Sequence, residues 1–302
     1  MPSRLRGQSL AETTSQSTGT QATEPVRGKI YNRSALTYSE TFEDPKKRFA
    51  IKAMEWMTGK ISIIRMIREF ERRPAVSGTK FWRACLDVMR IELRTPQEQL
   101  ANIPEKGPVI IVANHPHGMV DGMIMAELIG RRREDYRILT RSLLTGIDLE
   151  AASFLIPVPF PHEADAQEKF LEMRRQAMSH LKGGGVIALF PSGGVAASET
   201  MFGPVIEGEW NVFTAKMIRT SGAKVVPVYF TGANSRIYQI ANQISATLRQ
   251  GLLIHEIVKS CGKPQAPIIG APFAEDDIKS RISNPRDFMA WLREQTIGLK
   301  RA

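Results

Sequence analysis

The stretch that most constrains the fold is an apolar run at residues 109–113, which stops abruptly at Asn114. The run has the length and composition of a buried strand, and the next eight residues contain His115, His117 and Asp121 together with two glycines. In parallel α/β sheets, reactive side chains lie where a strand gives way to loop and helix, because the strand is rigid and the loop is open to a ligand. We therefore expect a buried strand that carries acid/base groups at its carboxyl end.

Strand and helix signals alternate along the rest of the chain. The apolar patterns and their boundaries predict strands at 109–113, 137–140, 186–190, 224–230 and 266–270, and helices at 119–130, 163–181, 210–220, 235–253 and 285–300. An apolar, proline-rich loop is expected at 154–161. The predicted fold class is therefore α/β, with a mainly parallel central sheet flanked by helices and preceded by a helical N-terminal region.

The N-terminal part is expected to differ from this α/β domain. Residues 1–27 are polar and lack aromatic side chains, which predicts a disordered tail. Helical periodicity follows at 44–73, up to Pro74, and again at 81–93. The predicted organisation is a tail at 1–27, a helical membrane-associating region at 28–95 and an α/β domain at 96–302.

The first predicted helix is basic and amphipathic. Its apolar side chains recur every three or four residues, at Met54, Met57, Ile61, Ile64 and Ile67, with arginines and lysines on or beside the other faces. Such a helix lies either in an anionic lipid interface, with its apolar side immersed, or on the protein core, with a solvated basic face. Both interpretations stay open from the sequence.

The chain carries a surplus of positive charge. Among its 302 residues, Lys and Arg number 41 against 31 Asp and Glu, a formal net charge of +10. Such a surplus suits an anionic partner, such as a membrane surface or a phosphate-bearing substrate. Nucleic acid is not expected as a partner, since the basic residues are not clustered with aromatics in a recognised module.

The cysteines and the hydropathy of the chain indicate its redox environment and its relation to a membrane. Cys85 and Cys261 are far apart and have neither disulfide-framework nor zinc-site spacing, which favours a reducing environment. The N-terminus lacks the apolar segment of a secretory signal, and there is no run of about 18 apolar residues to span a membrane. If the protein meets a membrane, it is expected to lie on it.

Two of the five histidines stand out as candidates for acid/base chemistry. His180 and His255 are expected to be ordinary polar residues of surface helices, whereas His115 and His117 have Asp121 close by. A carboxylate bonded to one imidazole nitrogen fixes the tautomer and leaves the other nitrogen free to take a proton from a hydroxyl. The spacing of one helical turn favours His117 as the partner of Asp121, since pairing with His115 requires the loop to fold back.

A metal site is the rival interpretation of the same cluster. The His-x-His pair and Asp121 could bind zinc or iron, but no additional strong ligand occurs at helical or loop spacing nearby. The proline between the two histidines also restricts the loop. No bound metal and no cofactor are therefore expected.

Residues 114–122, Asn-His-Pro-His-Gly-Met-Val-Asp-Gly, resemble the signature of the lysophospholipid acyltransferase superfamily, the glycerol-phosphate acyltransferase-like enzymes. The usual form is Asn-His, four residues and Asp, whereas five residues separate His115 from Asp121 here. This longer form is similar to a haemolysin-like bacterial branch associated with ornithine-lipid synthesis. The histidine after the asparagine is the one that the branch shares, so the resemblance implies His115 as the catalytic residue, with Asp121 orienting it and His117 in reserve.

Further segments resemble the same superfamily in the same order. They are residues 138–144, 154–160, 189–194, 225–230 and 232–236, so the resemblance extends from about residue 76 to 272. One block departs from the usual pattern, because Ser192 and Val195 stand where a Glu and an Arg are common. The resemblance therefore does not imply the usual glycerol-phosphate acceptor.

A set of candidate substrate-binding residues follows from these blocks and from the chemistry of anion binding. Backbone N–H groups at helix termini and turns hold anions, and so do arginine side chains. The predicted substrate-binding residues are Asn114, Gly118, Arg141, Ser192, Gly193, Gly194 and Arg236. For Gly193 and Gly194, a tight strand-to-helix turn is the alternative role.

The resemblance implies an O-acyltransferase of lipid metabolism, as in phospholipid biosynthesis. The implied reaction moves a fatty acyl group from acyl-CoA or an acyl carrier protein to the free hydroxyl of a lysolipid, either a lysophospholipid or a lyso-ornithine lipid. The implied location is an anionic membrane surface, at the cytoplasmic face of the bacterial inner membrane, where the protein is peripheral. Two alternatives stay open: an acyl-ester hydrolase with Ser192 as nucleophile, and a peripheral lipid-binding, haemolysin-like protein.

Overall fold

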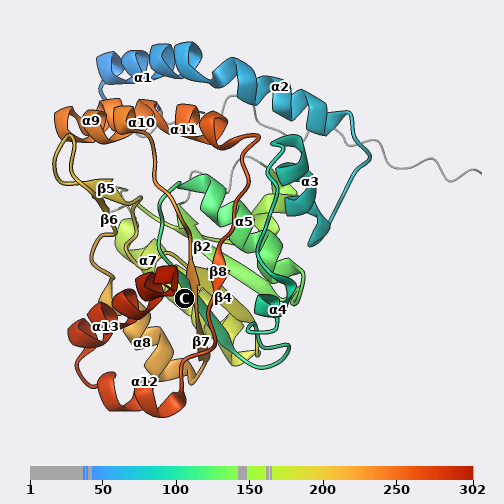
Figure 1. The fold of residues 1–302 in the computed structure, drawn as a ribbon, viewed down its shortest axis with the longest axis vertical. Helices are drawn as coiled ribbons and strands as arrows, with labels where there is room; N and C mark the ends of the chain where they lie inside the picture. The colour runs from blue at the N-terminus through green and yellow to red at the C-terminus, as the bar shows by residue number, and fades with distance from the viewer. Residues whose placement is uncertain are drawn as a thin grey trace, which may run out of the picture.

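The computed structural model describes residues 37, 39, 43–141, 148–160, 163 and 165–301 of the chain (Figure 1). The tail predicted at 1–27 lies outside these residues, so it stays a prediction, as do the domain boundaries. Within the described residues, every helix is too short or too polar to cross a bilayer.

Six strands form the central sheet, in the order β3-β2-β4-β1-β7-β8. They are β1 (Val109–Ala113), β2 (Tyr136–Arg141), β3 (Leu155–Val158), β4 (Val186–Leu189), β7 (Lys224–Tyr229) and β8 (Ile268–Ile269). Neighbouring strands are parallel except β7 and β8, which are antiparallel. The predicted α/β fold with a mainly parallel sheet is confirmed, and β1 lies inside the sheet between β4 and β7.

Helices cover both faces of this sheet (Figure 1). One face packs against α2 (Lys60–Glu71), α3 (Lys80–Val88), α5 (Met119–Gly130) and α11 (Leu253–Ser260), and the other against α7 (Ala166–Lys182), α8 (Val212–Ser221) and α13 (Pro285–Gly298). Successive side chains of a strand point to opposite faces, so Ile111 belongs to the first core and Ile110 to the second. Because β1 is buried on both faces, its sequence is a continuous apolar run.

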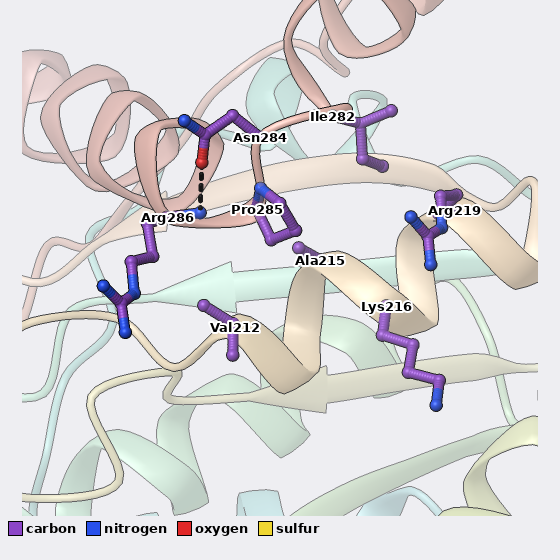
Figure 2. A pocket seen from close by; sticks show the side chains of 8 residues that line it. All are labelled: Val212, Ala215, Lys216, Arg219, Ile282, Asn284, Pro285 and Arg286. Atoms are coloured by element: carbon purple, nitrogen blue, oxygen red, sulfur yellow. Dashed lines mark hydrogen bonds between the residues drawn. The ribbon is translucent and has the colours of Figure 1, made fainter.

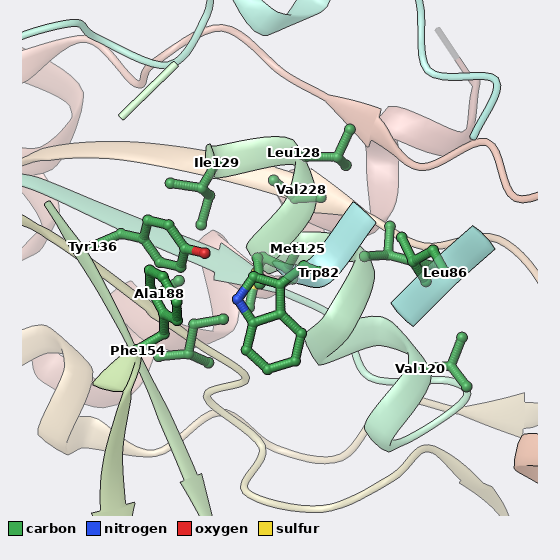
Figure 3. Close-up of a cluster of buried hydrophobic side chains, with 14 of the residues drawn as sticks. Trp82, Leu86, Val120, Met125, Leu128, Ile129, Tyr136, Phe154, Ala188 and Val228 are labelled. Carbon is green, nitrogen blue, oxygen red and sulfur yellow. The ribbon is translucent and has the colours of Figure 1, made fainter. Parts of the chain in front are cut away.

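Aromatic side chains fill part of the first core (Figure 3). Tyr136 of β2 stacks on Phe154 with ring centroids 4.9 Å apart, and Trp82 of α3 meets Phe154 edge-on at 6.1 Å. Burial raises the pKa of the Tyr136 hydroxyl far above its ordinary value, so this group stays neutral. Each such ring pair adds about 0.5–1.5 kcal/mol beyond simple burial, which fixes α3 against the sheet.

The remaining elements form an outer layer and several connections. The outer layer is made by α1 (Pro45–Thr58), α9 (Arg236–Ile244) and α10 (Ala246–Gly251), with α1 packed on α10 and α11 (Figure 1). The connections contain α4 (Gln97–Leu100), α6 (Leu149–Ser153), α12 (Glu275–Arg281), a final 3-10 turn (Leu299–Arg301) and a hairpin of β5 (Ala197–Ser198) and β6 (Val205–Ile206). None of these connecting elements was predicted from the sequence.

Two predicted helices are broken by contacts that the sequence does not display. The helix predicted at 44–73 is two helices, α1 and α2, which meet at Gly59. There the chain passes close to α11, and a Cβ on Gly59 would lie 3.1 Å from side-chain atoms of Ile254 and Val258. The helix predicted at 235–253 breaks at Ser245, whose backbone is extended and whose side chain caps α10 by accepting from the Thr247 N–H.

Two other boundary predictions are also corrected. The helix predicted at 81–93 ends already at Val88. The segment predicted as a loop at 154–161 contains the edge strand β3, which pairs only with β2 and has Pro157 within it. An edge strand tolerates proline because it has one side without ladder hydrogen bonds.

The break at Gly59 also changes which side chains of the N-terminal helices are buried. Ile63 and Phe70 pack into the core, whereas Met57 and Ile61, predicted on the apolar face, are 79% and 50% exposed. The large exposed apolar side chains of these helices are Phe49, Trp56, Met57 and Ile61, which we call the α1–α2 apolar surface. One side of the helices therefore joins the core, and another presents apolar groups to the outside. Contact of that outer side with lipid stays a prediction.

Arg133 joins several loops at the amino-terminal edge of the sheet, away from the carboxyl end of β1. Its guanidinium donates to both carboxylate oxygens of Asp135, at 2.6 and 2.8 Å, and to the carbonyls of Pro104, Gly107 and Gly184. Only 4% of the Arg133 side chain is exposed. A buried guanidinium with this many acceptors is a structural tie rather than a reacting group.

We expect Arg133→Met to lower the free energy of unfolding by about 3–5 kcal/mol, because the carbonyls and Asp135 lose their buried donor. Guanidinium chloride unfolding measures the change. The control is Arg132→Met, which removes an ion pair to a glutamate that is 66% exposed, Glu105, and is expected to cost about 1 kcal/mol or less. Equal losses in the two variants would contradict the assignment.

Candidate active site

Asn114 fixes the point at which the chain leaves β1. Its side-chain N–H group donates to the Phe230 carbonyl at 2.8 Å, and its side-chain oxygen accepts from the Phe230 N–H at 2.7 Å. Phe230 directly follows β7, so this pair of bonds joins the carboxyl ends of two neighbouring strands. The contacts show a structural role for Asn114, and its substrate-binding role stays a prediction.

Gly118 forms the turn between the histidines and helix α5. Its backbone has φ 74° and ψ −129°, a conformation that favours glycine, and it precedes the first residue of α5. A Cβ at this position would lie 3.3 Å from Cγ2 of Val195. The turn therefore needs glycine, and it brings Asp121, in the first turn of α5, back beneath the two histidines.

Asp121 contacts both histidines at once. Its Oδ2 lies 3.1 Å from Nδ1 of His115, and its Oδ1 lies 3.0 Å from Nδ1 of His117. The backbone N–H of His117 also donates to Oδ2, at 2.8 Å. The two pairings that compete in the sequence are therefore not alternatives, because one carboxylate holds both rings.

Burial and hydrogen bonding act in opposite directions on Asp121. Complete burial raises the pKa of this carboxyl, but hydrogen bonds and charge interactions with His115 and His117 outweigh burial and leave the pKa below its ordinary value. The carboxylate is therefore ionised at neutral pH and can only accept. Each Nδ1 must then carry a hydrogen, so Nε2 is the nitrogen of each ring that remains for contact with a ligand.

The two rings have different surroundings. The His115 ring stacks on Phe190, which follows β4, with centroids 3.8 Å apart and planes inclined by 21°. The His117 ring lies against the loop after β7, where a Cβ on Gly232 would come within 2.9 Å of Nε2. The side chain of His115 is 16% exposed and that of His117 10%. His115 is thus the more accessible base of the pair.

Glu207 holds the main chain of His115. Its Oε2 accepts from the His115 N–H at 3.0 Å, and its Oε1 accepts from the Trp210 indole N–H at 3.1 Å. The His115 carbonyl in turn accepts from the Ala196 N–H at 2.8 Å. Both backbone groups of His115 are therefore tied to the segment that enters and leaves the β5–β6 hairpin.

The turn after β4 carries three of the predicted binding residues. Gly193 has φ 66° and donates its N–H to the Phe190 carbonyl at 2.9 Å, as the turn interpretation expects. The Ser192 hydroxyl donates to the Gly194 carbonyl at 2.9 Å, and Arg141 donates to the Gly193 carbonyl at 3.0 Å. Burial lowers the pKa of Arg141, which still leaves it charged at neutral pH. The guanidinium of Arg141, at the end of β2, is thus held against the turn that follows β4.

Arg236 lies elsewhere in the fold. It begins α9 and donates to the Gly203 carbonyl at 2.7 Å, in the connection between β5 and β6. Gln239 and Gln243 of α9 bond the backbone of Ser198 in the same hairpin. Arg236 therefore helps to hold the hairpin that carries Glu207, and its substrate-binding role stays a prediction.

The other described histidines contact backbone carbonyls. Nε2 of His180 lies 3.0 Å from the Asp135 carbonyl, and Nδ1 of His255 lies 3.3 Å from the Thr58 carbonyl. Burial lowers the pKa of His180. In the part of the chain that the structure describes, no three His, Cys, Asp or Glu side chains are grouped so that they could hold a metal ion.

A comparison with protein families places this site in a known context. The sequence model of a family described as acyltransferase matches residues 45–278, which is more than half of the chain. The chain belongs to this acyltransferase family. The match contains β1, the motif with His115, His117 and Asp121, and Glu207.

Two curated proteins similar to this acyltransferase are each named lyso-glycine lipid O-acyltransferase. The protein from Phocaeicola vulgatus is 27% identical over 203 residues, which cover 65% of this chain and 69% of that protein. The protein from Bacteroides thetaiotaomicron is 26% identical over 172 residues, which cover 56% of this chain and 59% of that protein, less than two thirds of its length. The crystal structure of the 1-acyl-sn-glycerophosphate acyltransferase PlsC from Thermotoga maritima aligns with a TM-score of 0.48 and 15% identity, over 87% of this chain and 84% of that one.

Glu207 of this acyltransferase is a site residue that the sequence analysis missed. It lies in a polar segment, Glu207-Gly-Glu-Trp210, where nothing in the spacing sets it apart from the exposed Glu209. Glu207 is buried and bonds His115 only because the β5–β6 hairpin folds against the loop after β1. The two residues are 92 positions apart in the sequence. No sequence signal short of an alignment could have found it.

We expect Glu207→Gln to lower kcat by about tenfold and the free energy of unfolding by about 1–3 kcal/mol. The glutamine side chain has only one acceptor oxygen, so its N–H group would face either the His115 N–H or the Trp210 indole N–H, and that donor would lose its hydrogen bond. Steady-state kinetics and Trp210 fluorescence measure these effects. Glu209→Gln, the same change at an exposed neighbour, is the control and is expected to alter neither. An unchanged kcat together with a shifted Trp210 signal would show that Glu207 does not position His115.

Proposed function

We propose that this acyltransferase moves a fatty acyl group from a thioester donor, acyl-CoA or an acyl carrier protein, to the free hydroxyl of a lysolipid. The observation that carries the proposal is the buried, ionised Asp121, which holds His115 with Nε2 free to accept a proton. The names of the two curated relatives support a lysolipid acceptor. Because those relatives are named for glycine lipids, a lysolipid with an amino-acid headgroup, such as a lyso-ornithine lipid, is the first acceptor to test, ahead of lysophospholipids.

In the proposed mechanism, His115 is the general base. Nε2 of His115 takes the proton from the acceptor hydroxyl while that oxygen attacks the thioester carbonyl carbon. The ester bond forms, the carbon–sulfur bond breaks, and the proton passes from His115 to the departing thiol. Asp121 stabilises the imidazolium that forms during the step, and His117 shares the carboxylate as the reserve base.

We propose that the oxyanion of the reaction is stabilised from the turn after β4. The Gly193 N–H is already bonded to the Phe190 carbonyl, so the Gly194 N–H of the same turn is the proposed donor to the developing negative charge. Arg141, bonded to the Gly193 carbonyl, adds positive charge beside this turn and is proposed to face the anionic part of a substrate.

The proposed partner surface is an anionic membrane, to which the protein binds peripherally from the cytoplasmic side. Support comes from the α1–α2 apolar surface and from the formal net charge of +10.

We expect Trp56→Ser/Met57→Ser to release the protein from vesicles that contain anionic lipid, as measured by co-sedimentation. Lys106→Ser/Lys182→Ser, which changes two exposed side chains outside α1 and α2, is the control.

The test of the reaction uses purified protein, labelled acyl-CoA or acyl carrier protein, and a panel of lysolipids that includes lyso-glycine lipid, lyso-ornithine lipid and lysophosphatidate. The expected result is a labelled diacyl product with at least one acceptor. No product with any acceptor, at verified donor integrity, would overturn the proposal. An acyl group found covalently on Ser192 by mass spectrometry would instead favour the hydrolase alternative.

A further inference from the structure

A concave basic surface lies on the side of the sheet covered by α8 and α13, and none of its lining residues belongs to the histidine cluster (Figure 2). Its hollow has a volume of about 430 Å³. Apolar atoms of Val212, Ala215, Ile282 and Pro285 line its centre, and Asn284 completes the wall. Figure 2 shows the side chains of Lys216, Arg219 and Arg286 around this centre. We call this surface the α8–α13 hollow.

Within the described parts of the chain, the three cations of the hollow have no protein partner. Among the described residues, the side chains of Lys216, Arg219 and Arg286 make no hydrogen bond or ion pair, and all three are exposed. Asp287 lies beside them, but its carboxylate accepts from the Asn284 side chain at 2.6 Å. The hollow therefore combines an apolar floor with a surplus of positive charge, three cations against the one carboxylate of Asp287. That combination fits a partner that presents acidic side chains around an apolar contact.

One end of the hollow adjoins the proposed active site. Val212 begins α8, and the preceding residue, Asn211, donates its N–H to the Pro191 carbonyl in the turn after β4. Trp210, one residue earlier, bonds Glu207, which holds His115. From Val212 the hollow follows α8 to Arg219, about 10 Å away at the rise of an α-helix. A partner docked at the Val212 end therefore meets a residue that is next in sequence to those that bond Glu207 and the turn after β4.

The position of the hollow favours a soluble partner over a lipid surface. Helices α8, α12 and α13 lie toward the opposite end of the molecule from α1 and α2 in Figure 1. If the α1–α2 apolar surface rests on a membrane, the α8–α13 hollow faces away from it. An anionic lipid headgroup would then be out of reach, whereas a soluble acidic protein could approach freely.

We propose that the α8–α13 hollow docks an acidic acyl carrier protein, which delivers the acyl thioester to the histidine cluster. This inference rests on the proposed transferase function and names carrier protein, rather than acyl-CoA, as the preferred donor. Opposite charges across such a surface chiefly raise the rate of association and specify the partner. The cations come from separate parts of the chain, α8 and the start of α13, so only the folded protein displays them together.

The test compares palmitoyl-loaded acyl carrier protein with palmitoyl-CoA as donors for the full-length protein and for the variant K216E/R219E/R286E. We expect the KM for the carrier protein to rise by about tenfold or more and the KM for palmitoyl-CoA to change by less than about twofold. The matched control, K106E/K182E/K263E, makes the same change of charge at exposed lysines outside the hollow, and it is expected to retain the wild-type KM for both donors.

Three results would overturn the docking proposal: use of palmitoyl-CoA alone by the wild type, an unchanged KM for carrier protein in the hollow variant, or an equal rise in the control. If neither donor gives product, the proposed function fails, and biolayer interferometry with immobilised palmitoyl carrier protein still decides the docking. There the hollow variant is expected to bind about tenfold more weakly than the wild type and the control. If the variant K216E/R219E/R286E does not fold, the neutral variant K216Q/R219Q/R286Q is used in its place.

Discussion

Alanine in place of His115 is expected to lower kcat by about a thousandfold while leaving the fold intact. The physical reason is the loss of the accessible Nε2 base, and a positioned general base contributes about 10²- to 10⁴-fold to a rate. The ring is not needed to hold the turn, because the main chain of His115 is bonded to Glu207 and Ala196. Steady-state kinetics with a responsive lysolipid, together with thermal unfolding, measure both effects.

The matched control for this variant is His117→Ala, which removes the second ring from the same carboxylate. We expect a loss of only about tenfold, because His117 supports Asp121 without acting as the base. A lipid-binding protein without catalysis would keep its activity in both variants. A larger loss in His117→Ala than in His115→Ala would assign the base to His117, the residue that sequence spacing favours.

Asparagine in place of Asp121 is expected to lower kcat by about 10³- to 10⁴-fold at neutral pH. The amide can accept from one ring but presents N–H hydrogens to the other groups, so the tautomer that leaves Nε2 free is lost and the imidazolium is not stabilised. Buried donors are also left unpaired, which lowers the free energy of unfolding by about 1–3 kcal/mol. Kinetics and guanidinium chloride unfolding measure the two changes separately.

The control for Asp121→Asn is Asp87→Asn, the same chemical change in an exposed ion pair with Arg83. We expect Asp87→Asn to retain the wild-type kcat. If Asp121→Asn kept most of its activity after correction for the folded fraction, the proposed role of the carboxylate would be wrong. Tight lipid binding by an inactive Asp121→Asn protein would agree with the transferase proposal.

The stability that Asp121 contributes is expected to depend on pH in a defined direction. Because the pKa of this carboxyl is lower in the folded protein, its contribution is complete above the ordinary value of 3.8 and is lost as the pH falls through the lower folded value. The difference in unfolding free energy between wild type and Asp121→Asn should therefore shrink as the pH is lowered past that range. Urea unfolding at several pH values measures this, and a difference that grows in acid would contradict the assignment.

Local signals in the sequence predict the central elements of the fold well. The strand at 109–113 and the helix at 119–130 are observed with the predicted bounds. A strand buried on both faces must be a continuous apolar run, and Gly118 allows the turn into the helix that follows. Predictions fail where a distant segment intervenes, as at Gly59, where the approach of α11 breaks a helix that looks continuous in sequence.

The sequence by itself determined the α/β class, the strand that carries His115 and the proximity of both histidines to one carboxylate, because these follow from local apolar patterns and short spacings. Only the tertiary structure decided that Asp121 bonds both rings, that Glu207 holds His115 and that Lys216, Arg219 and Arg286 share one hollow. These arrangements join residues from separate strands, helices and loops. Their distances are set by packing of the whole sheet and its helices, which no short stretch of sequence encodes.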